Sequence, residues 1–260
     1  FGQPNLIISS IPLDIPANGN DMWSKHLVPS GVTEDRCIKA VQVKPRGDAK
    51  SVVHHANSNL ILEDESQGGM LTEYAMGKWG EIVPEGVCRT FPANAQVRWD
   101  IHMFPGGVGA MAQGKIIKDN VVEIGLWFHE PDFESKYKQD LSLYRLGDQA
   151  DIVIPPNGYY MTQGFKSFDH PVRIDSWQPH GHLRMNAASL EIFHPATGRT
   201  DEISQVSNWS ATWHHSHIFA PGAAPLVPAG SVLVMKQWYD NTSNNPNNPD
   251  PDQWVVGGSR

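Results

Sequence analysis

Apolar and polar residues alternate with a period of two in many short segments of this chain, which is typical of β-strands with one buried face. Residues 97–103 are a clear example, because Val, Trp, Ile and Met alternate there with polar side chains, and a Pro-Gly-Gly turn follows shortly after. On this pattern we predict strands at 36–43, 51–62, 87–91, 97–103, 115–128, 141–146, 151–154, 172–184, 189–193, 205–218 and 231–239. The chain is therefore expected to be all-β.

Turn-forming residues divide the chain into short segments. The 23 Gly and 20 Pro are spread over the whole sequence, as in β-sandwiches and barrels. The length of 260 residues exceeds that of a typical domain, which is about 100–200 residues. Residues 155–158, Pro-Pro-Asn-Gly, separate two strand-rich halves. We predict two antiparallel β-sandwich domains, at residues 1–150 and 151–260.

Charge and hydropathy exclude two classes of partner. The net charge is -8 and the sequence has no run of Lys or Arg, so it lacks the basic surface that binds nucleic acid. No apolar stretch approaches the roughly 20 residues that span a bilayer, so no membrane span is expected. The hydrophobic fraction of 40%, with nine Trp and nine Phe, is enough to fill packed cores.

The two cysteines both lie in the first half of the chain. Cys37 and Cys88 each fall inside a predicted strand, so they could bridge neighbouring strands. Two free buried thiols are the alternative. A bridge would favour an oxidising compartment.

Histidines are the residues with the most evident chemistry. Seven of the 12 fall into three clusters: His54 and His55, then His180 and His182, then His214, His215 and His217. Adjacent imidazoles raise each other's desolvation cost unless a cation binds them. In a strand, His180 and His182 would share one face and could close on one metal ion, and so could His215 and His217 as an extra site.

The first cluster needs a local irregularity to act as one site. His54 and His55 would point to opposite faces of a regular strand, so one of them needs a bulge to join the other. His102 offers a third ligand, because its face also carries Arg98 and Asp100 while the other face is apolar. Ligation by imidazole alone suits copper or zinc, and copper binds more tightly to equal nitrogen ligands.

Four motifs occur in a recognisable order. They are Val-Val-His-His at 52–55, Asp-Ile-His-Met at 100–103, Pro-His-Gly-His-Leu-Arg at 179–184 and an Asn- and Pro-rich stretch at 239–251. Together they resemble the copper type II ascorbate-dependent monooxygenases, the family of peptidylglycine α-hydroxylating monooxygenase and dopamine β-monooxygenase. The match looks closer to the bacterial relatives and covers most of the chain.

The resemblance implies two jelly-roll-like sandwiches packed side by side, each with one copper ion. His54, His55 and His102 would hold the electron-transfer copper in the first domain. His180 and His182 would hold the catalytic copper in the second domain, where the family binds dioxygen and abstracts hydrogen from a substrate C-H bond. In that family the coppers face each other across a solvent-filled cleft, and ascorbate supplies electrons one at a time.

The sequence departs from the family pattern at two points. The family completes its second copper with a Met beyond the Asn- and Pro-rich loop, and this chain stops at Arg260, short of that position. The second domain is therefore expected to be truncated at its C-terminal end, the alternative being that its copper has only the two ligands His180 and His182. The peptidylglycine hydroxylases carry an Arg two residues before His-x-His, and Gln178 stands there, so a glycine-extended peptide substrate is not expected.

Three hypotheses follow for the function. The first is a secreted or periplasmic copper-dependent monooxygenase that hydroxylates a small or medium organic substrate with dioxygen and an electron donor such as ascorbate or a redox protein. The second is a non-catalytic copper-binding subunit of a larger assembly. The third is a zinc hydrolase at His180 and His182, which would need Asp175 or Glu191 as ligand or base.

Overall fold

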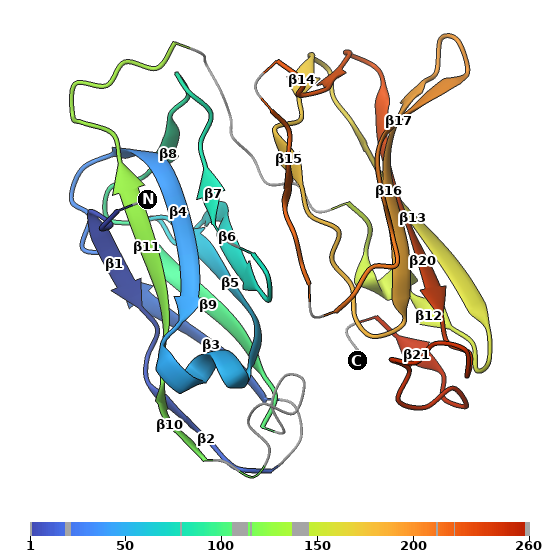
Figure 1. Ribbon diagram of the computed structural model, residues 1–260. Helices are drawn as coiled ribbons and strands as arrows, with labels where there is room; N and C mark the ends of the chain where they lie inside the picture. The colour runs from blue at the N-terminus through green and yellow to red at the C-terminus, as the bar shows by residue number, and fades with distance from the viewer. Residues whose placement is uncertain are drawn as a thin grey trace. The chain divides into compact units, whose positions relative to one another are not determined.

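The chain divides into two compact units, unit 1 at Phe1–Leu143 and unit 2 at Tyr144–Arg260. The computed structural model describes residues 2–18, 22–78, 80–105, 114, 116–136, 146–211, 213–220 and 222–257 (Figure 1). These residues form antiparallel strands and two short 3-10 helices, Gly47–Ser51 and Gln149–Asp151, with no α-helix among them. The predicted all-β class is confirmed. No helix within the described ranges is long and apolar enough to cross a membrane.

Unit 1 is a sandwich of two antiparallel sheets. Its strands are β1 Leu6–Ser9, β2 Leu13–Ile15, β3 Met22–Pro29, β4 Arg36–Pro45, β5 Val53–Ile61, β6 Gln67–Ala75, β7 Glu81–Ile82, β8 Arg89–Phe91, β9 Gln96–Met103, β10 Ile117–Asn120 and β11 Val122–Phe128. One sheet has the order β1-β11-β4-β7, with β8 also paired to β4, and the other has the order β3-β9-β5-β6 (Figure 1). Strands β2 and β10 form a separate pair.

The core of unit 1 lies between these sheets. Val41 and Leu126 contribute from one sheet, Trp99 and Ile101 from the other, and all four are fully buried. The alternation of β9 therefore has the predicted meaning: one face enters the core, and the opposite face carries polar residues that include His102.

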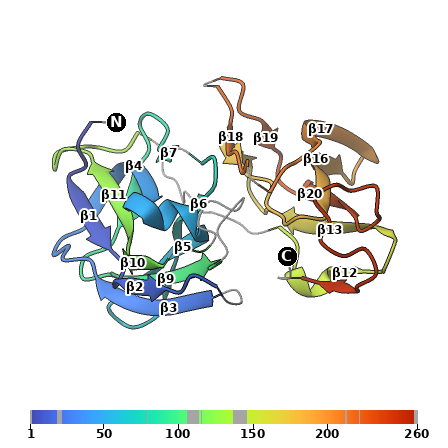
Figure 2. The same cartoon turned by 60° about the horizontal axis from the view of Figure 1, so that its bottom comes forward.

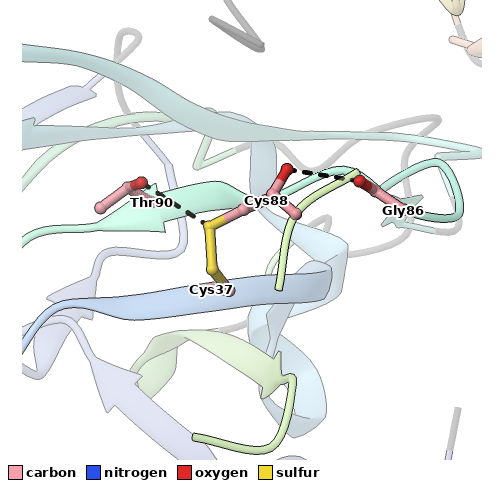
Figure 3. The surroundings of a disulfide bond; sticks show 5 residues. Cys37, Gly86, Cys88 and Thr90 are labelled. Atoms are coloured by element: carbon pink, nitrogen blue, oxygen red, sulfur yellow. Dashed lines mark hydrogen bonds between the residues drawn. A yellow bond between two sulfur atoms is a disulfide. The ribbon is translucent and has the colours of Figure 1, made fainter. Parts of the chain in front are cut away.

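A disulfide joins Cys37 to Cys88 in unit 1 (Figure 3). Cys37 lies on β4, and Cys88 directly precedes β8, which pairs with the same part of β4. Of the two alternatives left open by the sequence, the bridge is the one found. It closes a loop with a sequence separation of 51 residues.

Unit 2 contains one larger sheet and three short strand pairs. Its strands are β12 Val153–Ile154, β13 Tyr159–Ser167, β14 Val172–Arg173, β15 Ser176–Trp177, β16 Met185–His194, β17 Arg199–Ser207, β18 His217–Ile218, β19 Leu226–Val227, β20 Val232–Asp240 and β21 Val255–Val256. The order β13-β20-β16-β17 forms the sheet (Figure 2). The pairs are β12-β21, β14-β19 and β15-β18.

The core of unit 2 packs the larger sheet against the short pairs. Leu190 and Leu233 come from the sheet, while Trp177 and Val227 come from β15 and β19. The short pairs thus supply the second layer of the sandwich.

Two predicted strands of unit 2 are wrong in extent. Segment 172–184 is strand only at 172–173 and 176–177, because Pro179 has no N-H for a ladder and the chain then turns at 182–185, where Met185 N donates to His182 O at 3.0 Å. Segment 205–218 is strand only up to Ser207 and again at 217–218, because Asn208 takes a left-handed conformation with φ 55° and ends β17. Most of the predicted strand 141–146 lies outside the described residues.

The Asn- and Pro-rich segment after β20 is more than a surface loop. Asn241 is 0% exposed, and its side-chain amide donates to the carbonyls of Pro155 and Gln253, both at 2.9 Å. Its Oδ1 accepts from Arg184 Nε at 3.2 Å and from Asn248 Nδ2 at 3.0 Å. Arg184 therefore anchors this loop, and burial lowers the pKa of its guanidinium, which the nearby Asp250 partly opposes.

Candidate metal centres

Three histidines converge in unit 1. The ligand atoms offered by His54, His55 and His102 all lie within 4.8 Å of one another. The ring centroids are 5.3 Å apart for His54 and His55, 5.2 Å for His54 and His102, and 5.0 Å for His55 and His102. The residues are 6%, 6% and 1% exposed, respectively. We call this set the three-histidine group.

The local irregularity that the sequence requires is present in β5. Val53 pairs with Met103 across the sheet, but the next pair joins His55 to His102, so the register shifts and His54 is the extra residue. Without this bulge, alternation would turn His55 toward the core, where Ala56 now lies. The bulge therefore brings both consecutive histidines to His102.

Trp23 completes the surroundings of the three-histidine group. It is the register partner of His102 on β3, and the two rings stack with centroids 4.0 Å apart and an interplanar angle of 4°. The same indole meets the edge of His55 at 5.5 Å. Aromatic packing of this kind fixes the orientation of an imidazole, as outer-shell partners of metal ligands do.

The charged residues that share the sheet face of His102 have partners other than the histidines. Lys25 Nζ lies 3.4 Å from Asp100 Oδ2, and Arg98 donates to Gln67 Oε1 at 3.0 Å. The three-histidine group is therefore an all-imidazole donor set in a buried place. An imidazole-metal bond is about 2.0–2.1 Å, so nitrogens on opposite sides of an ion are about 4 Å apart. Small ring rotations would close this group on copper or zinc.

His180 and His182 lie together in unit 2, although not on a strand. They occupy the loop between β15 and β16, with ring centroids 5.7 Å apart and an interplanar angle of 64°. The predicted reason for their proximity, a shared strand face, is wrong. The two rings are nevertheless neighbours.

Side chains from later segments hold this loop in place of a strand ladder. Three consecutive carbonyls accept hydrogen bonds: Pro179 O from Trp209 Nε1 at 3.3 Å, His180 O from Gln237 Nε2 at 2.6 Å, and Gly181 O from His214 Nε2 at 3.3 Å. Tyr239 in turn donates to Gln237 Oε1 at 3.0 Å, and burial raises the pKa of its hydroxyl. The loop is thus positioned before any metal binds.

His214 is the residue of the third cluster that reaches this site. It is 1% exposed, and its ring centroid lies 5.0 Å from that of His180 and 4.8 Å from that of Trp209. Sequence reasoning missed it, because a regular strand would have paired His215 with His217 and turned His214 away. The sequence signal available was its position beside the other two histidines.

His215 and His217, the predicted extra metal pair, have different neighbours. The ring of His215 meets Trp213 at 4.3 Å, and that of His217 meets Trp177 at 5.7 Å. Burial, with a smaller contribution from His215, lowers the pKa of His217. Within the described part of the chain, neither residue belongs to a group of three metal-ligating side chains.

Gly181 is required by the packing of the loop. A Cβ at this position would lie 2.2 Å from Met185 Sδ and 2.7 Å from Met185 Cβ, which is closer than atoms can approach. We therefore expect Gly181→Ala to displace the loop and to weaken any metal binding at His180 and His182 by about 10-fold. Isothermal titration calorimetry would measure this, with unchanged binding at the three-histidine group as the internal control. Equal weakening of both sites would contradict the prediction.

The two carboxylates that a zinc hydrolase would need, Asp175 and Glu191, are paired with other side chains. Asp175 accepts from Arg173 Nε at 2.7 Å. Glu191 accepts from Lys236 Nζ at 2.7 Å and from Ser189 Oγ at 2.8 Å. Burial acts to raise the pKa of Glu191, but these two donors outweigh it and hold the pKa below its usual value. Neither carboxylate is therefore placed as a free general base.

A scan against protein-family models finds no match for this chain, and a search of curated proteins finds none. The assignment of function therefore depends on the residues and their geometry.

Proposed function

We propose that this protein is a copper-dependent monooxygenase that hydroxylates a C-H bond of an organic substrate with dioxygen and an external reductant. The observation that carries the proposal is the buried three-histidine group, whose ligand atoms lie within 4.8 Å of one another. The group is formed by a pair of consecutive histidines and a distant third, in the pattern of the electron-transfer copper site of the resembling family. Copper is preferred to zinc because it binds imidazole more tightly.

The two candidate sites would have different tasks. When bound, copper supplies the accessible one-electron couple that this chemistry needs. The three-histidine group is closed by three imidazoles and by Trp23, which suits a site that only passes electrons. His180 and His182 offer two imidazoles on a loop held by side chains, which suits a site that keeps a position for another ligand.

The disulfide supports a place of action outside reducing compartments. Bonds of this kind persist in secreted and periplasmic proteins and are rare where thiols are kept reduced. We propose that the protein acts in a secreted or periplasmic setting.

Metal analysis and oxygen consumption test the proposal together. The full chain, stripped of metal and titrated with Cu(II), is expected to bind two equivalents. His180→Ala/His182→Ala should remove one equivalent, and the triple alanine variant of the three-histidine group should remove the other. With both sites filled, ascorbate is expected to drive oxygen uptake that the zinc-loaded protein does not show.

Each alternative has a distinct outcome in this experiment. Two bound copper ions without reductant-dependent oxygen uptake would contradict the enzyme and favour a copper-binding subunit. Zinc recovered from protein purified without added metal, together with weak copper binding, would contradict copper.

A further inference from the structure

Trp23 links the buried three-histidine group to the surface of unit 1. The histidines are nearly inaccessible, whereas Trp23 is 51% exposed. Its ring is in stacking contact with His102 and in edge contact with His55. One indole therefore touches two of the three candidate ligands and also faces solvent.

An exposed Trp is unusual on a strand whose neighbouring positions are partly buried. Along β3, Trp23, Lys25 and Leu27 are exposed, while Met22, Ser24, His26 and Val28 are partly buried. Exposing half of a Trp forgoes much of the burial that a large aromatic side chain usually contributes. Because β3 and β9 are in register at Trp23 and His102, the indole stacks on the imidazole of His102.

We propose that the exposed face of Trp23 is the place where a small organic one-electron donor, of the enediol class, delivers its electron to the three-histidine group. The inference rests on the proposed function, since it requires copper at that group. With copper bound at the group, the donor would lose one electron to Cu(II), giving Cu(I), and one proton to solvent, and would become its radical. The stacked rings provide a continuous aromatic contact from solvent to a ligand imidazole.

The surroundings of Trp23 favour a small donor over a docking protein. The next exposed residue on the strand is Lys25, whose ammonium lies near Asp100, and it separates Trp23 from the exposed Leu27. Even weak redox complexes between proteins bury about 1,000 Å² of surface. A single exposed indole offers far less area than that, which suits a small donor instead.

The test measures reduction at the three-histidine group alone. In the full chain with His180→Ala/His182→Ala, one equivalent of Cu(II) is bound, and the decay of its electron paramagnetic resonance signal is followed anaerobically after mixing with ascorbate. Trp23→Leu is expected to keep the bound equivalent but to slow this reduction by about 10-fold. Trp23→Phe keeps a flat ring and should stay close to the parent.

Two controls separate donor contact from a structural role. Trp254→Leu removes an indole of unit 2 that is 64% exposed, and it should leave the rate unchanged. Reduction by dithionite, a small inorganic donor that needs no aromatic platform, should be slowed far less by Trp23→Leu than reduction by ascorbate.

The outcomes distinguish this inference from the proposed function. If Trp23→Leu is reduced by ascorbate as fast as the parent, or if both reductants are slowed equally, the inference is overturned and the function stands. If the parent binds no copper at the three-histidine group, the proposed function is overturned and the inference with it.

Discussion

Replacing His102 by alanine is expected to remove one of the two copper equivalents. His102 is the central member of its group, because it is the register partner of both His55 and Trp23 and is 1% exposed. Without it, His54 and His55 would still lie together at the bulge, but the third ligand would be missing. We expect affinity at this site to fall by more than about 100-fold, the upper end of what an outer-shell substitution costs.

Competitive titration with a copper chelator would measure this loss. His26→Ala is the matched control, because His26 is a partly buried histidine of the same sheet that hydrogen-bonds Ser24 and lies outside the group. Copper bound at the second site should be retained in both variants. Two tight equivalents in His102→Ala would show that the three-histidine group is not the site.

Removing the disulfide is expected to cost unit 1 a large part of its stability. Closing a loop with the observed separation of 51 residues stabilises a fold by about 4 kcal/mol in the chain-entropy account. Small domains are stable by only about 5–15 kcal/mol in total, so Cys37→Ser/Cys88→Ser should leave unit 1 marginal.

Urea unfolding would measure this change. Reducing the parent protein should reproduce the double variant, since both lack the same bond. The loop at His180 and His182 lies in unit 2, so its copper binding should survive in the variant at low urea. An unfolding midpoint that neither reduction nor substitution shifts would contradict the prediction.

Much of unit 1 could be predicted from its sequence. The strand at 97–103 and its two faces were predictable, because core residues and polar residues alternate along it without interruption. The need for a bulge at His54 and His55 was predictable for the same reason, since consecutive histidines cannot share a face otherwise. Both follow from the period of a strand.

The residues around the candidate sites were harder to find. β3 was missed because its partly buried face includes Ser24 and His26 while Trp23 is exposed, the reverse of the usual pattern. His214 was missed because its segment is an irregular loop held by side chains, and no sequence period describes such a path. The positions of Trp23 and His214 depend on contacts with residues that are distant in the sequence.

The single extra residue in β5 means that the number of residues in this strand decides whether three imidazoles can meet. Deleting His54, the one residue between Val53 and His55, would restore an unbroken ladder with Met103 and His102, and the protein would retain a regular strand. Only one of the two imidazoles would then remain on the outer side. Evolution or design could therefore abolish the centre by a one-codon deletion that hardly disturbs the sandwich, while leaving His102 and Trp23 intact.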